Sequence, residues 1–502
     1  MKFRLTVLIV FSLCLSNVFA DEGMWLLGNL RKNKQTDRVM KELGLQMPVN
    51  KIYDPKKPCL ADAVVSFGGF CSGVVVSEDG LVFTNHHCGF SSIQQHSSVE
   101  HDYLKDGFFA RSLEEELPNP ELYVRFLLRT EDVTKRVLSA ARHAKTETER
   151  RVAVDSIMNV ISMEVSEKDS TLTGIVDAYY AGNEFWLSVY RDYNDVRLVF
   201  APPSSVGKFG WDTDNWMWPR HTGDFSVFRV YAGPDNRPAD YSPENRPYKA
   251  EKFLKISLGG YDEGDFAMIM GFPGSTQRYM TSYEIDRLLE MENPQRIFIR
   301  GERQAILKED MAASAKVRIQ YASKYAQSSN YWKNSIGKSR GIRRLDVKGR
   351  KQEQEAAFTA WAAKNTLPTE GYSNALNLIR ESVEETAPYF ASSQYLSEAI
   401  GRSVEILAPA RLAVSKKGGE LTEALKAFYK DYNMPTDRRV AKRMFRIVGE
   451  NCKELPSVFA EVIGKRFGGD TDAYVDYLYD NSVFADERKA LAAAAAGTDV
   501  SN

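Results

Sequence analysis

The chain lacks several features that would place it in a nucleic-acid-binding, membrane-spanning or metal-dependent class. Its 66 Lys and Arg residues nearly balance its 67 Asp and Glu residues, so it has no basic surface to attract nucleic acid. After residue 20, no apolar run is long enough to span a bilayer. A His-Glu-x-x-His zinc motif is absent, and Gly271-Phe272-Pro273-Gly274 lacks the Gly-Lys-Ser/Thr ending of a phosphate loop. We find no internal repeat of roughly 20–50 residues, which excludes a solenoid.

The first 20 residues are predicted to be a secretory signal peptide. Lys2 and Arg4 precede an apolar run at residues 5–15, and short side chains occupy the −3 and −1 positions of a cleavage site after Ala20. We therefore expect a periplasmic or secreted protein that has no membrane span.

Cysteine is scarce, and its placement is informative. Cys14 is removed with the predicted signal, which leaves Cys59, Cys71, Cys88 and Cys452. An even number of cysteines in an oxidising compartment favours disulfides. The sequence predicts a bridge from Cys71 to Cys88, because two short strands joined by a turn separate them. Cys59 and Cys452 can pair or stay free, and the sequence does not decide between these states.

A histidine pair directly precedes Cys88. The predicted hairpin ends at residue 83, and His86 and His87 follow it. A disulfide at Cys88 would give His87 the rigid support that a catalytic base needs. We expect both histidines on a strand, where adjacent side chains point to opposite faces, so the sequence predicts no metal site here.

The chain changes character near residue 271. Before it, we predict short strands at residues 63–69, 72–83, 122–128, 196–200, 225–231 and 266–270, with a charged helical insertion at residues 130–167. After it, we predict helices at residues 282–290, 304–325, 352–364, 394–407, 420–432, 437–448 and 471–479. Strands followed by helices indicate an α+β protein.

The segment at residues 209–225 is a candidate pocket. Three tryptophans and three aspartates in so short a span favour a binding site over a plain loop. A histidine base needs a carboxylate to set its tautomer and to stabilise the imidazolium. From composition alone, Asp212, Asp214 and Asp224 are equal candidates for that role, as are His86 and His87 for the base.

Long strings in the chain resemble the bacterial dipeptidyl-peptidases 7 and 11, which are periplasmic serine exopeptidases, and the resemblance is stronger to the dipeptidyl-peptidase 7 side. The matching segments cover nearly the whole mature chain. They lie at residues 23–27, 84–89, 102–108, 201–210, 212–225, 271–276 and 321–326, with Asn330 just beyond.

The resemblance implies a fold and a site. The fold is a chymotrypsin-like double β-barrel with a large helical domain, here a barrel region at residues 21–275 and a helical cap at residues 276–502. His87 is implied as the general base of a Ser-His-Asp triad, with Asp224 as the orienting carboxylate. Asn215, Trp216 and Asn330 are implied to hold the free N-terminal amine of an oligopeptide substrate. The resemblance implies no cofactor, and it implies a homodimer and a preference for hydrophobic side chains.

One departure from the family pattern concerns the nucleophile. The family carries its serine in a Gly-Asn-Ser-Gly-Ser-Pro string, which does not occur in these 502 residues. We therefore expect that the chain is truncated, that the remainder of the second barrel is missing, and that the chain alone has no peptidase activity. A non-catalytic periplasmic peptide-binding protein is the alternative, and a zinc hydrolase is a weaker one.

Overall fold

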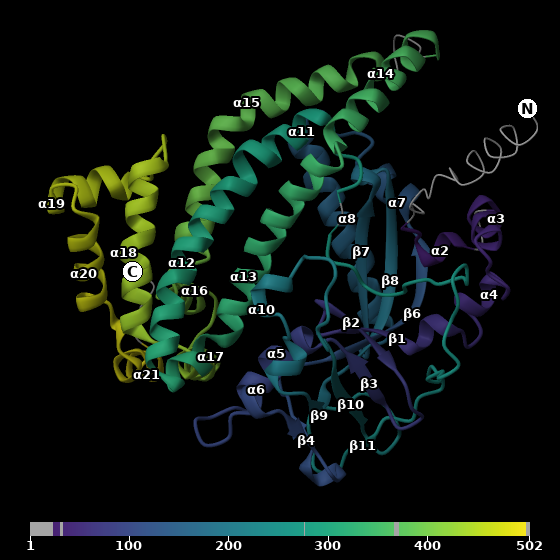
Figure 1. Ribbon diagram of the computed structural model, residues 1–502, viewed down its shortest axis with the longest axis horizontal. Helices are drawn as coiled ribbons and strands as arrows, with labels where there is room; N and C mark the ends of the chain where they lie inside the picture. Colours follow the sequence, from purple (N-terminus) through teal and green to yellow (C-terminus); the bar gives the residue numbers. More distant parts are fainter. Residues whose placement is uncertain (1–23, 31–33, 276, 366–370, 498–502) are drawn as a thin grey trace, which may run out of the picture. The chain divides into compact units, whose positions relative to one another are not determined.

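The computed structural model describes residues 24–30, 34–275, 277–365 and 371–497, which form one sheet and many helices (Figure 1). This confirms the α+β class. The predicted signal peptide and Cys14 lie outside the described residues. In the part of the chain that the structure describes, each helix is too short or too polar to cross a lipid bilayer.

The strands follow the β-branched and aromatic runs of the sequence. Nine of them occur in the order β4-β9-β10-β3-β2-β1-β6-β8-β7, while β11 pairs with β10 and β5 pairs with β9. Their bounds are β1 Val64–Phe67, β2 Cys71–Val75, β3 Leu81–Thr84, β4 Phe108–Phe109, β5 Leu117–Pro118, β6 Val124–Asp132, β7 Leu172–Tyr179, β8 Glu184–Tyr193, β9 Asp195–Ala201, β10 Ser226–Ala232 and β11 Arg246–Pro247.

The β2–β3 hairpin forms as predicted, with Val74 opposite Phe83 and Val75 opposite Val82. The sequence reading missed the β7–β8 hairpin, whose register runs from Leu172 opposite Arg191 to Tyr179 opposite Glu184. The predicted strand at residues 266–270 was wrong. No strand pairs with it among the described residues, and Phe266 and Met270 instead pack against a small apolar cluster of helices near the N-terminus.

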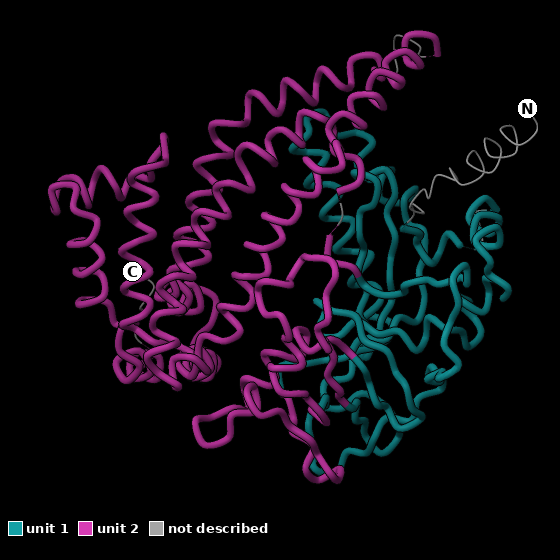
Figure 2. The backbone as a smooth tube through the Cα atoms, viewed as in Figure 1, with its two compact units in different colours: residues 1–83, 120–197, 229–272 teal, residues 84–119, 198–228, 273–502 magenta. Residues whose placement is uncertain are grey.

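The chain divides into two compact units, each built from three segments (Figure 2). Unit 1 contains residues 1–83, 120–197 and 229–272, and unit 2 contains residues 84–119, 198–228 and 273–502. The domain boundary at 275/276 stays a prediction.

Unit 1 has a hydrophobic core between its strands and the helical insertion that was predicted at residues 130–167. Helix α8 (Glu147–Lys168) packs on β7, where Gly174 leaves room for the helix, because a Cβ there would lie 2.8 Å from the Ser162 carbonyl oxygen. The helices of this unit are α2 Leu27–Leu30, α3 Lys34–Glu42, α4 Val49–Ile52, the 3₁₀ turns Leu60–Ala63 and Tyr180–Gly182, α7 Thr134–Ala140 and α8 Glu147–Lys168. The core residues between α7, α8 and the two strands are Val137, Ile161, Val165, Val176, Phe185, Leu187 and Val189.

Unit 2 is mostly helical. Its first helices are α5 His86–Gln95, α6 Tyr103–Asp106, the 3₁₀ turn Leu113–Glu115, α9 Ser204–Gly207 and α10 Trp211–Asp214. The later ones are α11 Ser282–Arg287, the π-helical turn Leu288–Glu292, α12 Asn293–Ala313, α13 Ala315–Arg344, α14 Val347–Asn365, α15 Ala375–Tyr395, the π-helical turn Leu396–Gly401, α16 Leu407–Ser415, α17 Gly418–Lys430, α18 Met434–Asn451, the π-helical turn Phe459–Gly464, α19 Lys465–Phe467, α20 Thr471–Asn481 and α21 Glu487–Ala495, with 3₁₀ turns at Tyr372–Asn374 and Val483–Ala485.

Two helix predictions need correction. The predicted helix at residues 304–325 is broken at Ser314, which adopts an extended backbone and caps α13 by accepting a hydrogen bond from the Val317 N–H. The chain reverses there, so α12 and α13 form an antiparallel pair. The predicted helix at residues 394–407 is right only up to Gly401, where the π-helical turn that continues α15 ends, and α16 begins only at Leu407.

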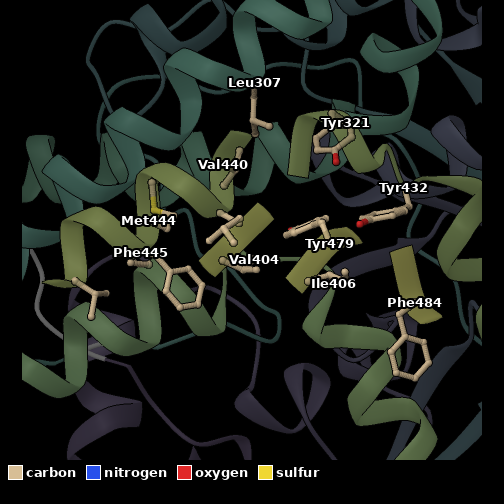
Figure 3. Packing of buried hydrophobic residues seen from close by; sticks show 14 of the residues in the cluster. Leu307, Tyr321, Val404, Ile406, Tyr432, Val440, Met444, Phe445, Tyr479 and Phe484 are labelled. Atoms are coloured by element: carbon tan, nitrogen blue, oxygen red, sulfur yellow. The ribbon is translucent and has the colours of Figure 1, made fainter. Parts of the chain in front are cut away.

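The core of the helical part combines aliphatic side chains with the rings of phenylalanines and tyrosines (Figure 3). Leu307, Val440 and Met444 are fully buried. The hydroxyls of Tyr432 and Tyr479 both donate to Asp437, at 3.2 and 2.6 Å. The buried Asp437 carboxylate thus has hydroxyl donors within this core.

Candidate active site

His87 lies in the first turn of helix α5, where we had predicted a strand. Asn85 has an extended backbone at the N-cap position, and the chain turns into the helix directly after it. We had excluded a metal site because adjacent residues of a strand point to opposite faces. That reason does not apply here, because both histidines lie in a helix. Successive helical residues are turned by about 100°, and this rotation separates the two histidines, with His86 buried and His87 exposed.

The structure pairs His87 with Asp224. Nδ1 of His87 lies 2.7 Å from Oδ2 of Asp224 and donates to it, and the His87 backbone N–H donates to Oδ1 at 3.0 Å. The carboxylate thus caps α5 in place of Asn85, whose side chain makes no capping bond. The side chain of His87 is 64% exposed while that of Asp224 is 15% exposed. The imidazole is therefore held on one side and open on the other.

The surroundings of Asp224 keep it ionised. Its backbone carbonyl accepts from the Asn85 side chain at 3.0 Å, and Arg220 lies 3.9 Å from Oδ2. Burial alone would raise the pKa of the Asp224 carboxyl, but the hydrogen bonds and charge of His87, with a smaller contribution from Arg220, hold that pKa below its usual range. An ionised carboxylate on Nδ1 leaves Nε2 as the nitrogen that can accept a proton.

The alternatives that composition left open occupy other positions. Asp212 accepts hydrogen bonds from Tyr325 and Ser329 on α13, and the carboxylate bonded to the His87 ring is that of Asp224. The ring of His86 packs edge-to-face on Phe90, and a Cβ at Gly207 would lie 2.4 Å from it. Burial, helped by the nearby charges of Lys208 and His87 and opposed by the attraction of Asp224, lowers the pKa of His86 to about 4. His86 is therefore a neutral packing residue at ordinary pH.

Asn215, Trp216 and Asn330 also come together. Oδ1 of Asn330 accepts from Nδ2 of Asn215 at 3.1 Å and from Nε1 of Trp216 at 2.8 Å. Asn330 is exposed and lies on α13, while Asn215 and Trp216 directly follow α10. The two N–H donors fix the Asn330 amide. Among the described residues, no hydrogen bond is made to the side-chain oxygen of Asn215, which can therefore act as an acceptor. An exposed cluster of neutral amide groups suits an ammonium ligand.

The structure contains the predicted disulfide between Cys71 and Cys88. A ring nitrogen of His87 lies within 4.8 Å of the Cys88 sulfur, so the bridge lies beside the imidazole. Because the two sulfurs are bonded to each other, neither offers a thiolate to a metal. Cys59 and Cys452 are free and buried, which answers the question that the sequence left open.

Removing the disulfide is expected to destabilise the protein without a change of charge. Replacing both Cys71 and Cys88 with Ser opens a short loop, whose closure contributes roughly 2–3 kcal/mol. The measurement is the urea midpoint of the double variant against the unaltered chain. A Cys59→Ser variant is the control for losing a buried sulfur, and equal midpoints for the double variant and the unaltered chain would contradict the expectation.

Sequence reasoning missed the residues that hold the helix of His87. The side chain of Gln94 donates to the Asp431 carboxylate at 2.9 Å and accepts from the Ser323 N–H at 2.7 Å, which ties α5 to α13. A signal was present, because Gln94 follows His86 by about two helical turns and faces the same buried side. It was hidden by the assignment of His86 to a strand.

The chain is similar to known proteins over nearly its whole length. The chain matches the family Peptidase S46 over residues 20–501. It is 47% identical over 471 residues to dipeptidyl-peptidase 7 of Porphyromonas gingivalis, and 46% identical over 505 residues to dipeptidyl-peptidase 7 of Porphyromonas endodontalis. These matches cover 92% and 97% of this chain but only 66% and 61% of those proteins.

A solved structure is similar as well. The crystal structure of Porphyromonas endodontalis DPP11 in complex with dipeptide Arg-Glu superposes with a TM-score of 0.82 at 35% identity, over 93% of this chain and 69% of that one. The family match spans nearly all of the sequence. The chain therefore belongs to the peptidase S46 family.

Proposed function

We propose that this chain carries the general base and the orienting carboxylate of a serine-type dipeptidyl-peptidase, an enzyme that releases dipeptides from the N-terminus of oligopeptides. The observation that carries the proposal is the pair of hydrogen bonds by which Asp224 holds the backbone and Nδ1 of His87 while the ring stays exposed. The relatives' names support the reaction class.

In the proposed mechanism, Nε2 of His87 accepts the proton of a serine hydroxyl as its oxygen attacks the scissile carbonyl. Asp224 stabilises the resulting imidazolium. His87 then returns the proton to the leaving amine, and the acyl-enzyme forms. Water attacks the ester in a second step, with His87 again as the base, and the dipeptide leaves.

The proposed anchor for the substrate amine is the cluster of Asn215, Trp216 and Asn330. If the amine held by this cluster lies two residues from the scissile carbonyl, only a dipeptide fits between the anchor and the nucleophile, which would explain an exopeptidase that removes dipeptides. The complexes of DPP11 with the dipeptides Arg-Glu and Arg-Asp support a peptide ligand. The identity is 47% to dipeptidyl-peptidase 7 of Porphyromonas gingivalis and 39% to the Asp/Glu-specific dipeptidyl-peptidase of the same species. Together with the family resemblance, this difference supports a preference for hydrophobic side chains at the cleaved bond.

The nucleophile is proposed to belong to sequence beyond these residues. The string that carries the family's serine does not occur here, and the relatives are longer than the part that this chain matches. We further propose, from the family resemblance, a chymotrypsin-like double barrel with a helical cap from residue 276, export through residues 1–20, and a homodimer.

The test compares the 502-residue chain with a whole protein that contains the serine string. We expect the whole protein to release dipeptidyl groups from coumarin substrates with a free amine, and to lose at least about 100-fold in kcat/KM when the amine is acetylated. The 502-residue chain alone should show no release. Turnover by this chain alone would disprove the proposed place of the nucleophile.

A peptide-binding protein without catalysis is the second candidate, because the amine anchor is complete while the serine string is absent. The peptide-binding function predicts that a dipeptide with a free amine binds to the chain. It also predicts that neither the chain nor the whole protein cleaves a dipeptide from a longer peptide. Calorimetric titration with free and acetylated dipeptides, together with the turnover assay, distinguishes the two functions.

A further inference from the structure

A carboxylate that the proposed mechanism does not use lies directly before the amine anchor. Oδ2 of Asp212, in α10, accepts from the Tyr325 hydroxyl at 2.6 Å, and Oδ1 accepts from the Ser329 hydroxyl. Tyr325 and Ser329 are buried and lie four residues apart on α13, so they form one side of that helix. Both oxygens of a single side chain are thus committed to a single helix.

The backbone around Asp212 adopts a conformation that contacts with other residues must stabilise. Trp211 has a φ of +47° and Trp216 a φ of +56°, values in the left-handed region that residues with a Cβ seldom adopt. A segment with two such residues does not keep this conformation by its own preference. Its conformation must come from contacts with its surroundings.

Further contacts along α13 hold the same segment. Lys333 Nζ donates to the Thr213 carbonyl oxygen at 3.3 Å. A Cβ at Gly337 would lie 3.1 Å from the Trp216 carbonyl oxygen and 3.3 Å from its Cβ, so the helix and the Trp216 backbone approach closely there. Together with Asn330, these residues make α13 a template for residues 212–216.

We propose that Asp212 is a positioning residue for the substrate amine. It fixes α10 on α13, and this places Asn215 and Trp216 so that both side chains donate to Asn330. The inference rests on the proposed function, because it assigns Asp212 a role in the amine anchor named there. Since Gln94 ties the helix of His87 to the same α13, one helix sets both ends of the space that a dipeptide would occupy.

The test is a double-mutant cycle in the whole protein, with free-amine and acetylated dipeptidyl-coumarins as substrates. We expect Asp212→Ala to lower kcat/KM for the free-amine substrate by about 10- to 100-fold, mainly through KM, and to change the acetylated substrate by less than about 3-fold. In an Asn330→Ala background, where the anchor is already lost, Asp212→Ala should cost less than about 3-fold more. An equal loss in both backgrounds would overturn the proposal.

The matched control is Asp214→Ala, which removes a carboxylate from the same short helix. Among the described residues, the Asp214 side chain makes no hydrogen bond to α13. It should leave kcat/KM unchanged. Tyr325→Phe removes one donor without removing Asp212, and it should reproduce part of the loss. If Asp214→Ala lowers kcat/KM as much as Asp212→Ala, the effect is general to the loop and the proposal fails.

A second measurement does not depend on turnover. Amide hydrogen exchange of residues 211–217 in the 502-residue chain should rise in Asp212→Ala and in Tyr325→Phe, and stay constant in Asp214→Ala. Unchanged exchange in Asp212→Ala overturns the inference. Equal turnover of free-amine and acetylated substrates by the unaltered whole protein overturns the proposed function instead, so the two failures are told apart.

Discussion

Asp224→Asn is expected to lower kcat of the whole protein by about 10⁴-fold, the loss seen when the aspartate of a serine-protease triad becomes an amide. The substitution keeps the shape of the side chain. It removes the charge that stabilises the imidazolium, and an amide N–H facing Nδ1 selects the tautomer in which Nε2 cannot accept a proton. The measurement is kcat with a dipeptidyl-coumarin that has a free amine.

The control for this prediction is Asp214→Asn, the same chemical change in the same segment of the chain. It should leave kcat within about 3-fold of the unaltered protein, because Asp214 does not bond to His87. Asp224 also caps α5 through the His87 N–H, so the melting temperature of each variant must be recorded. A loss below about 10-fold for Asp224→Asn in a folded protein would refute the assignment of the carboxylate.

Acidification is expected to destabilise the fold through His86. The unfolded chain binds a proton at this residue near pH 6.5, whereas burial lowers the pKa in the fold to about 4. Between these values the unfolded state holds more protons, so the stability falls as the pH falls, and the loss is complete below about pH 4. A shift of this size corresponds to about 3 kcal/mol.

The measurement is the urea unfolding free energy at a series of pH values from 7 to 4. His86→Phe removes the titrating group and keeps a ring against Phe90, so its pH dependence should be flatter than that of the unaltered chain by the same amount. His101→Asn, at an exposed histidine, is the control and should keep the steep dependence. Identical slopes for His86→Phe and the unaltered chain would rule out His86 as the cause.

The sequence predicted most of the candidate site because its residues lie in distinctive strings. The Cys71–Cys88 bridge, the β2–β3 hairpin and the α+β class followed from spacing and periodicity, and the structure confirms them. The choice of His87 over His86 and of Asp224 over Asp212 came only from family resemblance. Burial separates the histidines, and contacts separate the aspartates, and neither can be read from composition.

The errors have physical causes. Residues 266–270 are apolar and short, and such a run becomes a strand only if a partner strand is available. Residues 304–325 look like one amphipathic helix, since the hydrophobic period continues across Ser314, where a single capping residue reverses the chain. The hydrogen bonds of Asp212 and Gln94 to α13 were missed because their partners lie more than 100 residues away in the chain.

The first turn of α5 has a consequence for how the protein tolerates insertions and deletions. Since each helical residue adds about 100° of rotation, one extra or missing residue between β3 and α5 would turn His87 away from its carboxylate and move Cys88 out of line with Cys71. His86 could not replace His87 after such a shift. It would lie near the Asp224 carboxylate, but the Cys71–Cys88 disulfide would no longer support it. We expect lengths to vary elsewhere in this chain and to stay constant across this junction.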